Sequence, residues 1–198
     1  MAKYKDLEVW LSCLQNTENF ESVFRHVFER VMHGKGYGLL ILKGPSKEAN
    51  KSYFLNMVKA FQDGVPLKAK QYFSDDLQRL LGEVDVSQYQ CVDIKEDCPM
   101  DNVLGVPLYL TLPFSLASAS QKRGLKKAHK IIVLCDDLQE FLGNNEKEQM
   151  LFLGQIANFT NSYKEITFLG AYTPAYPKYN LDDTALSKYS LALGPVYD

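Results

Sequence analysis

The chain has 198 residues, of which 46% are hydrophobic and 23% charged, so it can bury a core and does not resemble a disordered protein. Its net charge of −2 excludes a protein whose whole surface attracts nucleic acid, but it permits a local basic patch. No apolar run approaches the roughly 20 residues that span a bilayer, and the N-terminal segment lacks a signal-peptide cleavage site. We therefore expect an intracellular protein, cytoplasmic or nuclear, without membrane contact.

In the first half of the chain, apolar residues at helical spacing predict helices over residues 7–14 and 20–31. Residues 37–44 are a short apolar run bounded by glycines, which predicts a buried strand. An amphipathic helix from about residue 49 to residue 62 follows. Three further elements are predicted before residue 95: a strand near 67–73, a helix near 74–84 and a strand at 89–94.

In the second half, the same patterns predict two strands, at residues 106–112 and 130–137, separated by a basic segment. A helix is expected over residues 138–159, with a break near Gly143. The last clear strand is at 165–172. The prolines and tyrosines beyond it predict an extended surface tail with a short helix near residues 182–189.

Helices thus alternate with short strands that are apolar on both faces. This alternation predicts an α/β fold with a mostly parallel sheet and helices on both faces. We divide the chain into N-terminal helices at 1–36, a P-loop-like core at 37–173 and a C-terminal extended tail at 174–198, all within one compact domain.

Cysteines and histidines are scattered without the paired spacing of a zinc site or a redox dithiol. We therefore expect reduced, mostly buried thiols and no metal bound through these residues. The residues are Cys13, Cys91, Cys98, Cys135, His26, His33 and His129.

Residues 43–54 have the order of a phosphate-binding loop: the end of a strand, Gly44, a loop, Lys51 and Ser52, then a helix. Such a loop directs backbone N–H groups and a helix N-terminus at phosphate oxygens. Lys51 would then reach the phosphates and Ser52 would hold Mg²⁺. The pattern G-x-x-x-x-G-K-[ST] is broken by one extra residue and by Asn50, which replaces a glycine but tolerates a left-handed backbone. The alternative is an ordinary strand–turn–helix connection with a solvated lysine.

Two strands end in acidic residues that could position Mg²⁺. Asp93 stands at the end of the short strand predicted at 89–94, with Glu96 and Asp97 nearby, and Asp136 and Asp137 follow the apolar run of 130–135. The alternative is that these acids are solvated or cap the next helix. We predict that Asp93 or Asp136 serves as the catalytic acid.

The segment 121–130 is basic and contains no acidic residue, in a chain that is slightly acidic overall. A basic loop with a central glycine can form a hairpin tip that grips single-stranded nucleic acid; an ordinary solvated loop is the alternative. The candidate nucleic-acid-binding residues are Lys122, Arg123, Lys126, Lys127 and Lys130.

Taken in order, these segments resemble the superfamily-3 helicases of small DNA viruses, a branch of the AAA+ ATPases. Residues 44–64 look like that family's phosphate loop and following helix, and residues 80–97 are similar to its Walker B region. The resemblance makes Gly44, Asn50, Lys51 and Ser52 the nucleotide-binding residues. It also implies ATP and Mg²⁺ as cofactors, with Ser52 and Asp93 as metal ligands.

In this alignment the basic segment takes the place of a nucleic-acid-binding hairpin, and residues 130–137 that of the sensor strand. In an alternative alignment residues 130–137 are the Walker B strand, and the sensor strand ends at Thr173, an order that looks like ATPases related to replication initiators and helicase loaders. The loop lacks its usual glycine and no arginine finger follows the sensor. We therefore expect hydrolysis of ATP to be weak or lost.

The sequence favours a degenerate AAA+-like nucleotide-binding or pseudo-ATPase domain in a nucleic-acid-associated or replication-related assembly, with protein partners and a capacity to oligomerise. The alternative is a non-enzymatic interaction or structural adaptor, favoured by tyrosines of a kind enriched at protein interfaces. A metabolic enzyme has no supporting motif. The tyrosines are Tyr163, Tyr172, Tyr176, Tyr179, Tyr189 and Tyr197.

Overall fold

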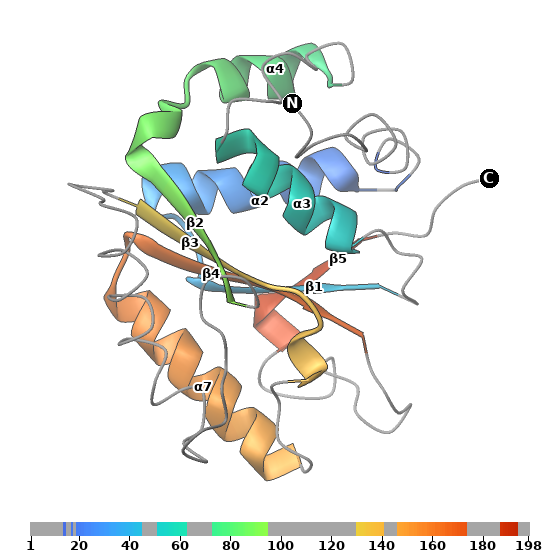
Figure 1. Ribbon diagram of the computed structural model, residues 1–198, viewed down its shortest axis with the longest axis vertical. Coiled ribbons are helices and arrows are strands. Elements are labelled where there is room, and N and C mark those ends of the chain that lie inside the picture. Colours follow the sequence, from blue (N-terminus) through green and yellow to red (C-terminus); the bar gives the residue numbers. More distant parts are fainter. Residues whose placement is uncertain are drawn as a thin grey trace.

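In the part of the chain that the computed structural model describes, a five-stranded sheet lies between two layers of helices (Figure 1). The structure describes residues 14, 17, 19–44, 51–62, 73–94, 130–140, 146–173 and 187–193. Every pair of neighbouring strands is parallel, which confirms the predicted α/β class. The strand order is β2-β3-β4-β1-β5, with bounds β1 (Leu39–Lys43), β2 (Tyr89–Asp93), β3 (Lys130–Cys135), β4 (Ile166–Tyr172) and β5 (Ser190–Ala192).

The described helices agree with the predicted ones at 20–31, 49–62 and 74–84, and the predicted helix over 138–159 is a 3₁₀ turn and a separate α-helix. The predicted elements at 7–14, 67–73 and 106–112 lie almost entirely outside the described residues. The helices are α2 (Phe20–His33), α3 (Lys51–Gln62), α4 (Asp75–Gly82) and α7 (Glu146–Ser162), and the 3₁₀ turns are η4 (Val86–Gln88), η5 (Leu138–Glu140) and η7 (Ser187–Tyr189).

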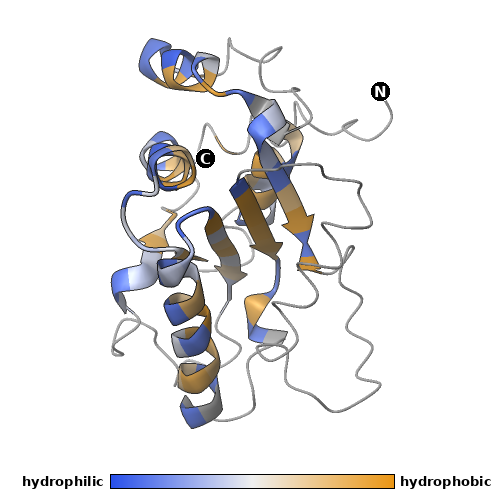
Figure 2. Cartoon of the chain, turned by 90° about the vertical axis from the view of Figure 1, so that its left-hand side faces the viewer, coloured by the Kyte–Doolittle hydropathy of each residue, from blue (hydrophilic) through white to orange (hydrophobic). Residues whose placement is uncertain are grey.

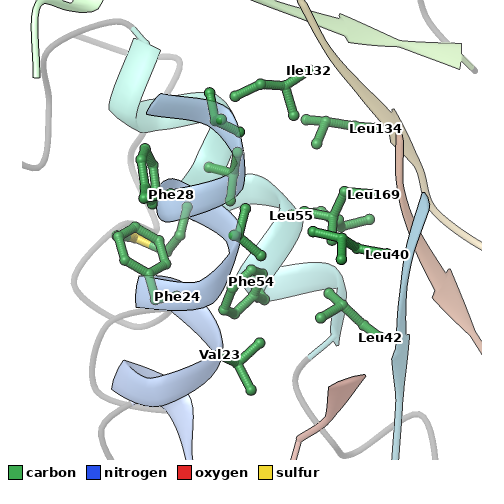
Figure 3. Close-up of a cluster of buried hydrophobic side chains, with 14 of the residues drawn as sticks. Val23, Phe24, Phe28, Leu40, Leu42, Phe54, Leu55, Ile132, Leu134 and Leu169 are labelled. Atoms are coloured by element: carbon green, nitrogen blue, oxygen red, sulfur yellow. The ribbon is translucent and has the colours of Figure 1, made fainter. Parts of the chain in front are cut away.

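One face of the sheet is covered by α2 and α3, and α4 packs against α2 farther from the sheet (Figure 1). Alternate residues of β1, including Leu40 and Leu42, point to this face, as the period of a strand requires. Phe24 and Phe28 of α2 and Phe54 of α3 belong to the same cluster, and Figure 3 shows Phe54 between α2 and the strands, with the rings of Phe24 and Phe28 on the other side of α2. Rings of Phe24 and Phe54 meet edge to face with centroids 5.6 Å apart, a favoured aromatic geometry.

The opposite face is covered by α7 and the two 3₁₀ turns η5 and η7. Leu39 and Ile41 of β1 point to this face and belong to one cluster with Phe152 and Ile156 of α7. Colouring by hydropathy shows apolar strands and helices that carry both polar and apolar residues (Figure 2). The sheet is therefore buried on both faces, which explains why its strands have continuous apolar runs rather than alternating ones.

Part of the C-terminal segment belongs to the sheet. The sequence assigned residues 174–198 to an extended surface tail, whereas β5 pairs in parallel with β1 and Leu193 N donates to Lys43 O at 2.9 Å. Tyr189, just before β5, is buried, and its ring meets that of Tyr37 at 4.9 Å. The three-residue sequence Ser-Leu-Ala is too short to show a strand periodicity, so its pairing could be learned only from the structure.

Connections between strands run in opposite directions along the sheet. After β1 the chain passes to β2 at one edge, whereas after β3 and β4 it moves toward β5 at the other edge. In open α/β sheets, ligands bind beyond the carboxyl ends of the strands where this direction reverses. Strands β1 and β4 lie side by side at the reversal. The residues that follow them are therefore candidates for a binding site.

At the opposite, amino-terminal edge of the sheet, Arg30 of α2 is fully buried. Its guanidinium donates to four backbone carbonyls: those of Gly34, Gly36, Thr160 and Ile166, at 2.9 to 3.2 Å. Burial lowers the pKa of Arg30 below its ordinary value, and the nearby Glu165 carboxylate acts in the opposite direction. Arg30 thus joins the end of α2, the end of α7 and the start of β4.

Within the described part of the chain, no helix is both long and apolar enough to cross a membrane.

Candidate functional site

Helix α3 begins at Lys51, seven residues after Gly44, which directly follows β1. Residues 45–50, Asn50 among them, lie outside the described residues. Lys51 is only 3% exposed, which is unusual for a lysine at the start of a helix. Burial lowers the pKa of Lys51, while the carboxylates of Asp136 and Asp137 raise it. A buried cation therefore stands at the N-terminus of α3, opposite two acids.

Ser52 connects the same helix end to β3. Its hydroxyl donates a hydrogen bond to Oδ1 of Asp136 at 3.0 Å. Asp136 directly follows Cys135, the last residue of β3, so the contact joins residues far apart in the sequence. Among the sequence-predicted candidates, Lys51, Ser52 and Asp136 are thus brought together at the carboxyl edge of the sheet. Gly44, at the end of the adjacent β1, lies at this same edge.

The backbone after Asp136 makes a turn that carries further polar groups. Asp137 has a φ of 53°, in the left-handed region that few non-glycine residues adopt. Its N–H donates to Asp136 Oδ1 at 3.0 Å. The amide of Gln139 donates to Asp137 Oδ1 at 3.2 Å and accepts from the N–H of Thr173, the first residue after β4, at 3.0 Å. Groups from α3, β3, η5 and β4 therefore form one connected polar network.

The spacing of two oxygens in this network fits a magnesium ion. Mg²⁺ binds oxygen at about 2.1 Å in octahedral geometry, so two adjacent ligands lie about 3 Å apart. The Ser52 and Asp136 oxygens are 3.0 Å apart. The described residues contain no group of three or more His, Cys, Asp or Glu side chains arranged to hold a metal ion. A magnesium ion here would need the remaining ligands from phosphate and water, as is common for this ion.

The charges of the site set a condition on any anionic ligand. Lys51 supplies one positive charge, and the N-terminus of α3 adds a partial one. Asp136 and Asp137 supply two negative charges beside them. A polyphosphate alone would meet both attraction and repulsion, whereas a polyphosphate with a divalent cation would satisfy the carboxylates and the lysine together.

Asp93, the other predicted acid, pairs with a different residue of α3. It is the last residue of β2, at the edge of the sheet, and its Oδ2 pairs with the ammonium of Lys59 at 3.1 Å. Lys59 is eight residues beyond Lys51 on α3, which corresponds to about 12 Å along the helix axis. The described contacts therefore join Asp136, rather than Asp93, to Ser52.

The predicted nucleic-acid-binding residues are described only at Lys130. Lys130 begins β3, donates to the carbonyl of Met32 at the end of α2, and lies 5.6 Å from the centre of the Tyr89 ring. Its ammonium thus takes part in packing at the amino-terminal edge of the sheet. Positions outside the described residues are Lys122, Arg123, Lys126 and Lys127, together with Glu96 and Asp97.

Gln139 is the functional candidate that the sequence did not suggest. A glutamine two residues after an acid has no motif of its own, and its partner Thr173 is far away in the sequence. Thr173 was named only as the end of the sensor strand in the alternative alignment. Only the adjacency of β3 and β4 brings these residues together.

No protein-family model, curated protein or solved structure matches this chain. The case for a function therefore rests on the geometry at the carboxyl edge of the sheet.

Proposed function

We propose that the protein binds a nucleoside di- or triphosphate together with Mg²⁺ at the carboxyl edge of the sheet. The observation that carries this proposal is the hydrogen bond between Ser52 and Asp136, beside the buried Lys51. Lys51 and the N-terminus of α3 would bind phosphate oxygens, and Ser52 and Asp136 would hold the ion. The position at the reversal between β1 and β4 supports the same proposal.

Of the two alignments, the one that assigns residues 130–137 to the Walker B strand has more support. It makes Asp136 the metal-associated acid and puts Thr173 at the end of the sensor strand. In the sheet, β4 lies between β1 and β3, and Thr173 is joined to the network of Asp136 and Asp137 through Gln139. We extend the proposal to a degenerate AAA+-like domain that binds nucleotide and has lost some or all of its capacity to hydrolyse it, in a nucleic-acid-associated or replication-related assembly.

Nucleotide binding is expected to raise the melting temperature of the protein. A ligand at 100 times its dissociation constant stabilises the folded state by about 2.7 kcal/mol. For a domain of this size that corresponds to a shift of roughly 5–11 °C. The measurement is a thermal-shift titration with Mg-ADP and with Mg-ATP. In Lys51→Met, which keeps an apolar stem in the buried position but removes the charge, the shift should disappear.

A matched control is Lys147→Met, because Lys147 is an exposed lysine on α7. This variant should keep the full nucleotide-dependent shift. A wild-type protein that shows no shift at millimolar Mg-ADP and Mg-ATP would contradict the proposal.

The binding is also expected to need the divalent cation. With EDTA in place of Mg²⁺, the carboxylates of Asp136 and Asp137 repel the phosphates, so ADP affinity should fall at least tenfold. In Asp136→Asn one negative charge and one anionic ligand are lost, and the dependence of affinity on Mg²⁺ should shrink. Calorimetric titration with ADP at several Mg²⁺ concentrations measures both effects. Equal ADP affinity with and without Mg²⁺ would remove the ion from the proposal.

The adaptor function is supported less by the described residues. Tyr172 and Tyr189, two of the tyrosines on which it relied, are buried within the domain, whereas Tyr163 is half exposed. A flat thermal response to both nucleotides, unchanged in Lys51→Met, would favour the adaptor.

A further inference from the structure

The polar network beyond β3 continues past the ion-binding oxygens to the end of β4. Asp136 Oδ1 accepts from two donors, the Ser52 hydroxyl and the Asp137 N–H, each at 3.0 Å. The side-chain amide of Gln139 donates through its nitrogen to Asp137 and accepts through its oxygen from the Thr173 N–H. A continuous series of hydrogen bonds thus runs from the first turn of α3 to the residue where the chain leaves β4.

The turn at Asp137, which holds this series of hydrogen bonds together, is fixed by packing against β4. Leu138, between Asp137 and Gln139, is fully buried and lies against Gly170 of β4. A Cβ atom at position 170 would come within 2.9 Å of the Leu138 side chain, so the glycine permits this close approach. A non-glycine residue in the left-handed region, such as Asp137, is strained and persists only where its surroundings determine its conformation. Here the Leu138 contact and the hydrogen bonds of Asp137 do so.

We propose that Gln139 is a positioning residue that couples Ser52 to Thr173, so that occupation of the phosphate site changes how the chain leaves β4. Its connection to nucleotide rests on the function proposed above; the coupling itself does not. Asp136 Oδ1 has two lone pairs, and both now accept hydrogen bonds, from the Ser52 hydroxyl and the Asp137 N–H. An ion bound to this oxygen would displace one of the two donors, and the change would pass through Asp137 and Gln139 to Thr173. By reciprocity, removing the Gln139 bonds must also change affinity for the ion and its nucleotide.

Exchange of the Thr173 amide proton, followed by NMR, reports the coupling without any ligand. In Gln139→Ala the Thr173 N–H loses its acceptor, and its protection should fall about tenfold, the equivalent of one hydrogen bond. In Ser52→Ala the same amide should lose protection severalfold, although residue 52 is in another element. The double variant should lose no more than Gln139→Ala, because both changes act along one path.

The amide of Phe168, near the start of β4, donates to the carbonyl of Gly38 and serves as an internal reference for global destabilisation. A merely structural effect of either change would lower the protection of Phe168 and Thr173 together. Gln88→Ala is the matched control variant, because the Gln88 amide donates to Asp85 at 3.0 Å in a turn before β2. It should leave the Thr173 amide unchanged.

Addition of Mg-ADP completes the test. In the wild type it should change the exchange rate of the Thr173 amide relative to that of Phe168, and in Gln139→Ala this response should be absent. If Ser52→Ala leaves Thr173 exchange unaltered, the coupling is refuted even where ADP binds. If Ser52→Ala lowers the exchange protection of the Thr173 amide but no nucleotide binds, the coupling stands and the nucleotide function fails.

Discussion

Replacing Arg30 with methionine is expected to destabilise the folded protein by about 3–5 kcal/mol, because four backbone carbonyls lose their donor and each lost hydrogen bond costs about 1 kcal/mol. The guanidinium serves four carbonyls from three segments, and methionine can satisfy none of them. Buried carbonyls without a partner keep their desolvation cost, and hydrogen bonds to a charged donor are stronger than neutral ones. Since folded domains are stable by only about 5–15 kcal/mol, the loss is a large fraction of the total.

Urea unfolding measures this effect directly. Arg30→Lys should recover only part of the stability, because a lysine has no planar fork to reach carbonyls in different segments. Arg79→Met is the control: Arg79 is exposed and pairs with Asp76 three residues earlier, so its loss should change stability by less than about 1 kcal/mol. Equal stabilities of the Arg30 and Arg79 variants would show that the carbonyl contacts contribute little. Failure of Arg30→Met to fold, with Arg79→Met folded, would agree with the expectation.

Gly38→Ala is expected to destabilise the protein by about 2–3 kcal/mol through overpacking. A Cβ atom at this position would lie 2.5 Å from Thr160 Cβ and 2.6 Å from the Thr160 carbonyl carbon and oxygen. Backbone atoms of α7 would have to move, and with them the Asn161 side chain, whose Oδ1 accepts from the Gly38 N–H at 2.9 Å. Arg30 also binds the Thr160 carbonyl, so the movement would disturb that contact too.

Gly154→Ala provides a control of opposite sign in the same helix. A Cβ atom there meets nothing within 4 Å, and alanine is favoured over glycine in a helix interior by about 1 kcal/mol. Chemical unfolding should therefore show Gly154→Ala to be more stable than the wild type and Gly38→Ala less stable. A Gly38→Ala variant as stable as the wild type would mean that α7 can move away from β1 at no cost.

Elements with strong periodicity could be predicted from the sequence because their patterns are local. The apolar positions of α2 and the continuous apolar runs of β1, β3 and β4 determine both the element type and its burial on one or two faces. The class of fold followed from their alternation. Residues whose role depends on distant partners could not be predicted in this way.

The two acidic strand ends illustrate the limit. Asp93 and Asp136 both follow short apolar strands, so sequence patterns alone left either one as the partner of Ser52. The choice depends on the order of strands in the sheet and on the path of α3 across it, which pairs Lys59 with Asp93 and Ser52 with Asp136. The role of Arg30 could not be predicted for a similar reason. A charged residue in an amphipathic helix is usually solvated, and two of the carbonyl partners of Arg30 lie 130 and 136 residues away in the sequence.

The placement of β1 between β4 and β5 has a consequence for biogenesis. Leu39 pairs with Phe168, and Ile41 pairs with both Gly170 and Ser190, so both neighbours of this strand are made long after it. During synthesis β1 cannot pair on either hydrogen-bonding edge until the later strands β4 and β5 have left the ribosome. Pairing across such long separations makes folding slow and exposes the nascent chain to aggregation. The edge that carries Lys51 and Asp136 is therefore among the last parts of the protein to mature.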